Sequence, residues 1–581
     1  MSLSKVRDLL LTGAVFLILI LYFFHPINDL VGDLGFYLKG GEIILRTHSV
    51  FQTNLFSYTN PNFPYLNINW LSELVFYSIF KTLSFNGLLL TTVFISFLTF
   101  LIVFFTSQKK YGLPATLITS LLFLQILFER TDVKPEVFSY FFVSLFLFIL
   151  FKFKDRHSNL IYFLIPLETL WVNFHIYFFV GLALISIFII DEIIEAKNFK
   201  LSTRLKTLLT VFIGSLVSTL INPNFLKGTL YPLFVLNNYG FKVEENIDFL
   251  TAFNSYNDTT FLYFGLSLVI LFIGLIFFYK KLKPIDFILS IIFSAFALFA
   301  VRCFPLFALG VFIPFAKIAN ETISRTCSYF KKDKKTLISY GVVLMGFLLV
   351  IPTIIFNVGI HGVGFGVIDN SDAAINFIHD HSLSGPMYNN YDIGNYLIYR
   401  LYPKIPVFVD GRPEAYPKSF FEKTYYPMQL NPKVFDEVSK KYDFNFIVIE
   451  YTDTSPETIE NLKQLIKSNT WSMVFLNSST VIFLKNNISN QMLMGRYEIN
   501  EKNFKVSKSD LNSKDSVRRY VNFFRTIGWD DSWLAMNLRY LDFEPNNCPA
   551  LQNVAYIMQE KNLPTAQIYI NKFISICSRT Y

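Results

Sequence analysis

Charged and strongly polar side chains stand at the ends of long apolar segments, where residues of these types suit proton transfer and anion binding. Carboxylates such as Asp33 can take a proton from a reacting group. Arg and Lys side chains such as Arg302 and Lys134 bind anions, Arg with bidentate geometry. Polar groups at membrane depth are costly and usually mark a site or a pathway, so their gathering near one face is informative. The set comprises Asp33, Lys134-Pro135-Glu136, Asn173, His175, Asn222-Pro223-Asn224, Glu244, Glu245 and Arg302.

Each of these residues also has an ordinary structural explanation. Asp33 can cap a helix or stand in a loop, and His175 can be a hydrogen-bonded histidine inside a helix bundle. Arg302 and Lys134 can extend to lipid headgroups. Asn222-Pro223 is typical of a helix stop.

The composition predicts a membrane protein with a separate water-exposed part. Of 581 residues, 52% are hydrophobic and 16% are charged, against about 25% charged in soluble domains. Apolar runs dominate residues 8–356, whereas 370–581 have ordinary charge. The net charge of +8 does not indicate nucleic-acid binding, because Lys and Arg gather in short loops beside apolar segments. We expect a polytopic α-helical membrane domain over residues 1–356.

The length of the apolar runs predicts about eleven membrane spans, since a bilayer needs about 20 apolar residues per helix. Lys5 and Arg7 precede the first span and no small-residue cleavage site follows, which indicates a retained anchor. Alternating the spans from a cytoplasmic N-terminus places every dense Lys/Arg cluster inside. This topology puts 25–85, 129–135, 222–260 and everything after 357 outside a plasma (inner) membrane. The expected spans are 8–24, 86–106, 113–128, 136–152, 159–173, 176–190, 207–221, 261–279, 285–300, 303–318 and 336–356.

The first outer loop, 25–85, is too long and too patterned to be a simple connector. Leu38, Ile43, Ile44 and Leu45 indicate an amphipathic helix at the membrane surface. Trp70 is placed as a residue of an interfacial aromatic belt would be.

Residues 357–485 are expected to form an extracytoplasmic α/β domain. Short runs rich in Val, Ile and Phe predict strands at 407–410 and 444–450, and 471–485 predicts two strands around an Asn-Ser-Ser turn. Helical spacing is found over 456–468. Asp410-Gly411-Arg412 follows the first of these strands, as a turn with a surface Arg or as a lip over a membrane site.

The C-terminal segment is predicted to be a linker, 486–515, followed by a helical region, 516–581. Residues 545–576 resemble one tetratricopeptide-type (TPR-like) helix pair, which we expect to pack on helices near 516–541 because one repeat cannot bury its own face. This region is either a protein-docking unit or a plain helical cap. Cys548 and Cys577 can pair if the tail is extracytoplasmic, or can be free core residues.

Taken in order, these segments resemble the GT-C superfamily of membrane glycosyltransferases, which use polyprenyl-phosphate sugars, and most closely a poorly characterised prokaryotic branch. The resemblance covers most of residues 25–485 and rests on the order of the motifs rather than on any single one. The motifs are DLGFYLKGGEIIL (33–45), TNLFSYT (53–59), NINWLSE (67–73), KPEVFSY (134–140), LWVNFH (170–175), INPNFLKGTLYP (221–232), VRCFPLFAL (301–309) and NNYDIGNYLIYRLYPKIPVFVDGRPEAY (389–416).

The resemblance implies transfer of a sugar to an acceptor hydroxyl on the outer face of the membrane, in a cell-envelope pathway. It implies that Asp33 is the catalytic base. Arg302, then Lys134, would bind the lipid phosphate, and His175 would bond the phosphate or the sugar. Acceptor or substrate contacts are assigned to Glu244, Glu245, Asn173, Trp70, Asp410 and Arg412.

The chain also departs from the pattern of that branch. The branch often has His where this chain has Tyr37, an acidic residue where it has Asn69, and Arg-Pro-His where it has Lys134-Pro135-Glu136. With no His/Cys ligand cluster, these departures weaken any proposal of a bound metal, although a divalent cation stays open. The acceptor is a glycan, a lipid or a protein.

Two other classes of function are compatible with a polytopic membrane protein. A lipid or polysaccharide transporter often shows inverted repeats and polar residues near the bilayer midplane. The sequence has no convincing internal repeat, and its polar residues gather at one face. A non-catalytic membrane scaffold that docks partners through 516–581 is the third interpretation.

Overall fold

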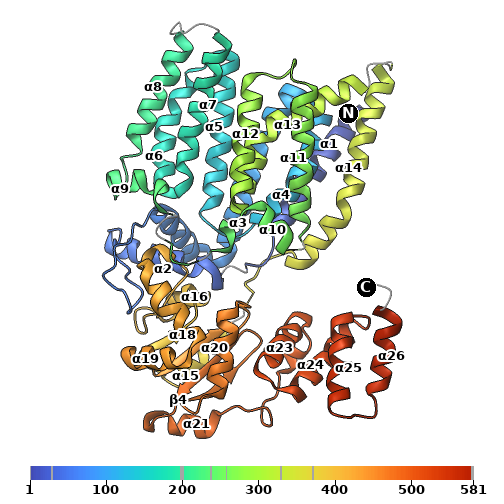
Figure 1. The fold of residues 1–581 in the computed structure, drawn as a ribbon. Coiled ribbons are helices and arrows are strands. Elements are labelled where there is room, and N and C mark those ends of the chain that lie inside the picture. Colours follow the sequence, from blue (N-terminus) through green and yellow to red (C-terminus); the bar gives the residue numbers. More distant parts are fainter. Residues whose placement is uncertain are drawn as a thin grey trace. The chain divides into compact units, whose positions relative to one another are not determined.

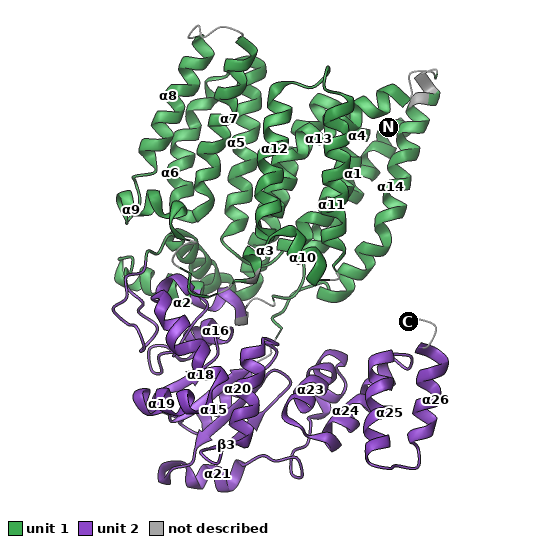
Figure 2. Ribbon diagram, in the orientation of Figure 1, with its two compact units in different colours: residues 1–29, 37–52, 66–368 green, residues 30–36, 53–65, 369–581 purple. Residues whose placement is uncertain are grey.

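The computed structural model of the chain consists of two compact units (Figure 2). Unit 1 comprises Met1–Asp29, Tyr37–Gln52 and Leu66–Ile368, and unit 2 comprises Leu30–Phe36, Thr53–Tyr65 and Asp369–Tyr581. Two pieces of the loop assigned by sequence to the membrane domain therefore pack with the C-terminal residues. The structure describes residues 2–27, 30–196, 202–235, 239–241, 243–256, 258–326, 330, 332–368 and 372–577.

Unit 1 is a helical bundle whose long helices lie side by side (Figure 1). The helices α13 (Phe304–Thr326) and α5 (Glu136–Arg156) are central, because 83% of the most apolar stretch of Val301–Thr326 and 78% of that of Glu136–Arg156 is buried. The helix α14 (Lys332–His361) is peripheral, because only 17% of the most apolar stretch of Thr336–His361 is buried. Its α-helices are α1 Leu3–Phe23, α2 Gly35–Thr47, α3 Trp70–Tyr111, α4 Leu113–Leu127, α5 Glu136–Arg156, α6 Leu164–Phe174, α7 Phe179–Ala196, α8 Thr203–Ser218, α9 Phe225–Leu230, α10 Phe249–Ser255, α11 Thr259–Phe277, α12 Pro284–Phe299, α13 Phe304–Thr326 and α14 Lys332–His361.

A helix lies at each of the eleven expected spans, and the chain is a multi-pass membrane protein. Among the described residues, eight helices are long and apolar enough to cross a membrane. The other three positions hold α6, α8 and α12, which have 11, 16 and 16 residues. The expected spans 159–173 and 176–190 are shorter than a bilayer needs, but the helix at the second extends over Ile176–Ala196.

The amphipathic helix expected near residues 38–45 is α2, and its apolar face is buried in protein. Leu38, Ile43 and Ile44 are 1%, 8% and 5% exposed. A Cβ at Gly40 would lie 2.3 Å from Glu73 Oε2, and one at Gly41 would lie 2.1 Å from the Glu73 carbonyl oxygen. The glycine pair thus lets α2 approach α3 closely.

Unit 2 contains a four-stranded sheet of order β1-β2-β4-β3. The strands are β1 Met387–Asn389, β2 Phe446–Glu450, β3 Trp471–Leu476 and β4 Thr480–Lys485; β1 and β2 are parallel and the other pairs are antiparallel. Every residue of β2 is buried, as its apolar sequence predicts for a central strand. Asn477 Oδ1 accepts from Ser479 N and Thr480 N, which closes the expected turn between β3 and β4.

The prediction of a strand at 407–410 is wrong, because the described backbone there joins no ladder of the sheet. Val407, Phe408 and Val409 are fully buried, so the apolar run was a correct sign of burial. Their backbone bonds go elsewhere: Val407 N donates to Phe56 O, and Phe408 N donates to Asn389 Oδ1. The strand that sequence reasoning missed, β1, has only three residues.

The segment predicted as a linker, 486–515, is ordered against its neighbours. Ile499 N donates to Met473 O on β3, and Glu501 Oε1 accepts from Asp531 N and Ser532 N. The helices of unit 2 are α15 Asp372–Asp380, α16 Gly394–Leu401, α17 Lys418–Phe420, α18 Tyr426–Leu430, α19 Pro432–Tyr442, α20 Pro456–Lys467, α21 Gln491–Tyr497, α22 Lys508–Leu511, α23 Lys514–Ile527, α24 Asp530–Phe543, α25 Cys548–Glu560 and α26 Ala566–Cys577.

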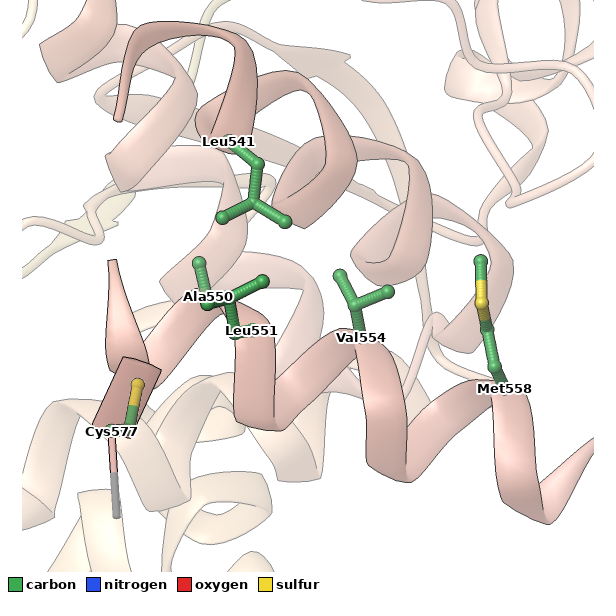
Figure 3. Packing of buried hydrophobic residues seen from close by; sticks show 6 residues of the cluster. All are labelled: Leu541, Ala550, Leu551, Val554, Met558 and Cys577. Carbon is green, nitrogen blue, oxygen red and sulfur yellow. The ribbon is translucent and has the colours of Figure 1, made fainter. Parts of the chain in front are cut away.

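In the tail, α25 packs on the preceding α24, as expected because one helix pair cannot bury its own apolar face. Leu541 of α24 meets Ala550, Leu551 and Val554 of α25 in one buried cluster (Figure 3). Cys548 and Cys577 form a disulfide with Cα atoms 5.7 Å apart, and are not free core cysteines. Cys577 is fully buried.

We predict that one buried glutamate makes the stability of unit 2 depend on pH. Burial raises the pKa of Glu450 from 4.5 to about 7, despite a hydrogen bond from Thr452. Its stabilising contribution is therefore fully present below about pH 4.5 and is lost as pH rises through 7. The pKa difference of about 2.5 corresponds to about 3 kcal/mol. Thermal unfolding of Glu450→Gln should therefore show no such loss of stability between pH 5 and 8. The exposed Glu437→Gln is the control, and equal pH slopes in both variants would contradict the prediction.

Candidate functional site

Unit 1 gathers three cations from separate helix ends, called the cationic cluster: Arg130, Lys134 and Arg302. Arg130 ends the turn that follows α4, Lys134 stands two residues before α5, and Arg302 lies in the turn before α13. Arg130 Nη1 lies 2.6 Å and Lys134 Nζ 3.1 Å from the same oxygen, Oε1 of Glu245. The sequence-predicted residues Lys134, Glu245 and Arg302 thus belong to one neighbourhood.

Arg302 is held by three polar groups. Its Nη2 lies 3.3 Å from Glu136 Oε1, its Nε donates to the Tyr177 hydroxyl at 2.9 Å, and its Nη1 donates to Asn246 Oδ1 at 3.1 Å. Glu136 is the first residue of α5, and Asn246 follows Glu245 in the turn Glu244–Asn246. Since that turn contacts Arg302 and, through Glu245, Arg130 and Lys134, it closes over all three cations.

The electrostatics of Glu245 show how strongly the cluster favours an anion. Burial opposes ionisation of Glu245, but Lys134 and Arg130 outweigh it and hold the pKa of Glu245 well below its usual value. Arg130 Nε is buried and has no hydrogen-bond partner within the described part of the chain. The cluster can therefore bind a compact oxyanion with several acceptor oxygens.

His175 borders this neighbourhood through Tyr177, with ring centroids 4.6 Å apart. Trp171 Nε1 donates to Ser139 Oγ, which lies 3.0 Å from His175 Nδ1, and the Tyr177 N–H also points at Nδ1. Nδ1 is thus an acceptor, and the proton of the neutral ring is on Nε2. His175 is 4% exposed.

Asn173 and Trp70, assigned by sequence to substrate contact, are tied to each other. Trp70 Nε1 donates to Asn173 Oδ1 at 2.9 Å, and Asn173 Nδ2 donates to Thr169 O and Ile221 O. These bonds connect α3, α6 and the end of α8. The side chain of Glu244 lies outside what the structure describes.

In unit 2, Asp410 and Arg412 form a buried pair rather than a turn with a surface Arg. Arg412 Nε and Nη2 each donate to an Asp410 oxygen at 2.8 Å, and the pair is 0% and 2% exposed. Tyr416 also donates to Asp410. Although burial opposes it, Asp410 raises the pKa of Arg412, so the guanidinium stays charged.

Aromatic rings from the first loop surround that guanidinium. The Arg412 Cζ lies 5.1, 4.8 and 4.8 Å from the ring centroids of Phe36, Phe56 and Tyr65, and Nη2 donates to Asn54 Oδ1. Cation–π contacts of desolvated Arg are worth about 2 kcal/mol or more. Arg412 therefore fixes both loop pieces, 30–36 and 53–65, to the C-terminal residues of unit 2.

Asp33 lies in the turn Leu30–Leu34, which packs against α16. Asn395, the second residue of α16, donates from Nδ2 to Asp33 Oδ1 at 3.3 Å. Burial raises the pKa of Glu414 to about 7, and Asp410 and Asp33 add to this shift, while Arg412 opposes it. Among the described residues, no group of three or more His, Cys, Asp or Glu side chains is placed to hold a metal ion.

Several of these residues were not identified by sequence. Arg130 was given no role from the sequence, although its spacing of four from Lys134 was a usable signal. Tyr177, Asn246 and Asn395 carry no signal in a single sequence, because their partners are distant in the chain.

The chain has the GT-C membrane fold that the resemblance implied. It is similar to the oligosaccharyltransferase AglB from Archaeoglobus fulgidus, solved with an inhibitory peptide and a dolichol-phosphate, at TM-score 0.57 and 10% identity over 93% of this chain and 86% of that one. The apo oligosaccharyltransferase of the same organism matches at TM-score 0.54 and 11% identity over 83% and 74%. ArnT from Cupriavidus metallidurans, bound to undecaprenyl phosphate, matches at TM-score 0.50 and 10% identity over 83% and 98%. No protein-family model matches the sequence, and no curated protein matches it.

Removing the Arg412 guanidinium should destabilise unit 2 by about 3–5 kcal/mol, because it leaves Asp410 charged, buried and unpaired. Arg412→Ala would be compared with Lys418→Ala, which breaks the exposed pair with Glu422 and should cost about 1 kcal/mol or less. Urea unfolding of the purified protein in detergent measures both. Equal costs for the two variants would contradict the role of the pair.

Proposed function

We propose that this chain is a membrane glycosyltransferase that moves a sugar from a polyprenyl-phosphate donor to an acceptor hydroxyl. The observation that carries the proposal is the cationic cluster in a chain with the GT-C fold. Arg130 and Lys134 bond one carboxylate oxygen of Glu245, and Arg302 bonds the neighbouring Asn246, an arrangement that suits a phosphate headgroup. The dolichol-phosphate bound to AglB and the undecaprenyl phosphate bound to ArnT support this class of donor.

The proposed reaction is a displacement at the anomeric carbon of the sugar. The acceptor oxygen forms the new bond to that carbon as the bond from carbon to phosphate oxygen breaks, and polyprenyl phosphate leaves with the bonding electron pair. Arg302 and Lys134 stabilise the charge of the leaving phosphate. Asp33 takes the proton of the acceptor hydroxyl.

Two further residues have assignments in this scheme. With Nδ1 of His175 occupied as an acceptor, its Nε2–H is a donor for a phosphate or sugar oxygen. Glu245 was expected to position the acceptor. Its ion pairs support a different role, in which its carboxylate neutralises Arg130 and Lys134 until a donor phosphate replaces it.

We place the reaction on the outer face of the plasma membrane. The distribution of Lys and Arg among the loops supports a cytoplasmic N-terminus and an outer C-terminal unit. The disulfide between Cys548 and Cys577 independently supports an oxidising compartment for the tail.

The proposed base predicts that Asp33→Asn strongly reduces turnover. The protein, purified in detergent, would be incubated with a panel of polyprenyl-phosphate sugars, and release of polyprenyl phosphate would be measured. Losing the general base should reduce release by about 10²–10⁴-fold.

The matched control is Asp436→Asn, an exposed aspartate on α19 of the same unit. Asp436→Asn should retain wild-type release. Release at the wild-type rate by Asp33→Asn would support the transferase activity and exclude Asp33 as its base. A wild type that neither releases nor binds any donor would contradict the proposed function.

The proposed displacement of Glu245 predicts that Glu245→Gln binds polyprenyl phosphate more tightly, because the lipid no longer competes with a carboxylate. We expect about a tenfold lower Kd, or about 1.4 kcal/mol, measured with undecaprenyl phosphate in detergent. Arg302→Leu should weaken the same binding. Glu422→Gln, an exposed glutamate of unit 2, is the control and should leave Kd unchanged. Weaker binding by Glu245→Gln would mean that Glu245 orders the cations instead of competing for them.

A further inference from the structure

Asn395 uses both ends of its side-chain amide, although the sequence assigned no role to this residue. It is 1% exposed. Its Oδ1 accepts from the backbone N–H of Gly411 at 3.2 Å, and its Nδ2 donates to Asp33 Oδ1 at 3.3 Å. It therefore bridges the Asp410-Gly411-Arg412 turn and the proposed base.

The orientation of this amide is fixed by its partners. A backbone N–H can only donate, so the Gly411 N–H must face Oδ1, and the amide NH2 must then face Asp33. A carboxylate can accept that bond without any change of protonation.

Two glycines permit this close arrangement. A Cβ at Gly411 would lie 2.3 Å from Asn395 Nδ2, and a Cβ at Gly394 would lie 2.3 Å from Val409 O. Neither position has room for a side chain, so α16 and the 409–411 backbone are in direct contact. Since Arg412 is in turn held by Phe36, three residues after Asp33, the turn and the base are tied at two points.

We propose that Asn395 is a positioning residue for Asp33: its amide fixes the rotation of the Asp33 carboxylate and favours the ionised form that accepts a proton. An N–H donor to a carboxylate stabilises the charged state. This inference rests on the proposed function, which makes Asp33 the base. The other charged groups near Asp33 include Arg400 on α16, which pairs with Asp372, and Asp410, Arg412 and Glu414 in and after the turn that Asn395 contacts. All of them stay unchanged in the variants below.

Asn395→Asp separates positioning from a merely structural role. The substituted carboxylate can still accept from Gly411 N–H, so the contact with the turn is kept. Its second oxygen replaces the NH2 donor and repels Asp33. In the double variant Asp33→Asn/Asn395→Asp the donor and acceptor exchange places, and a hydrogen bond forms in the opposite direction.

The first measurement needs no activity. Thermal unfolding of the full chain in detergent at pH 7 should give a lower Tm for Asn395→Asp than for wild type, and a recovery in the double variant. The control is Asn390→Asp, another amide that is 1% exposed and joined at both ends, here to Glu450 O and N. Its Tm loss should not be recovered by Asp33→Asn. Additive Tm shifts for Asp33→Asn and Asn395→Asp would overturn the proposal.

The second measurement is the pH profile of polyprenyl phosphate release. In Asn395→Asp the acidic limb of kcat should move to higher pH with KM for the donor within about threefold, because Asp33 is harder to ionise. Asn390→Asp should keep the wild-type profile. A profile unmoved in Asn395→Asp would overturn the positioning role. A recovered Tm in the double variant with no wild-type turnover would instead refute the proposed function, and the positioning role with it, while leaving the contact established.

Discussion

The cost of leaving a charge unpaired in a low-dielectric interior organises unit 1. Ionisable residues inside a membrane domain are rare and usually pair with one another or with backbone carbonyls, and α5 shows such pairing at both ends. Its first residue, Glu136, pairs with Arg302. At its other end, Lys154 bonds Asp191, which is 1% exposed and also accepts from Ile285 N at the start of α12. Ion pairs thus clamp the two ends of a helix whose middle is almost wholly Phe, Leu, Val and Ile.

The two clamps differ in what they can do. The pair at Lys154 involves residues of α5, α7 and α12, all within long helices, and it fixes their mutual positions. The cationic cluster is closed by Glu245 from a turn of three residues, and the side chain of Glu245 is 34% exposed. In the proposed function, the donor phosphate replaces that carboxylate. The same physical requirement, pairing of a buried charge, gives a tie between long helices at one end and, in the proposed function, an exchangeable tie at the other.

The sequence predicted those features that depend on local pattern. Apolar length located a helix at every expected span, the apolar run 444–450 predicted β2, and Asn-Ser-Ser predicted the turn before β4. It failed where long-range partners decide the outcome. Residues 407–410 have the composition of a strand, but Asn389 and Phe56 take their backbone bonds. Arg412 looked like a surface residue because nothing near it in sequence shows that Phe36, Phe56 and Tyr65 surround it.

The geometry of the buried pair Asp410–Arg412 explains why unit 2 tolerates an arrangement that costs so much desolvation. Replacing a buried ion pair by apolar residues is often neutral or stabilising, so stability alone does not account for Asp410 and Arg412. Unlike an apolar cluster, the pair is directional, because two hydrogen bonds to Asp410 orient the Arg412 guanidinium. The oriented guanidinium then contacts three aromatic rings and donates to Asn54, all from the first loop. That loop carries Asp33. A pair that specifies one arrangement of the loop, rather than one that adds stability, is what the proposed role of Asp33 as the base requires.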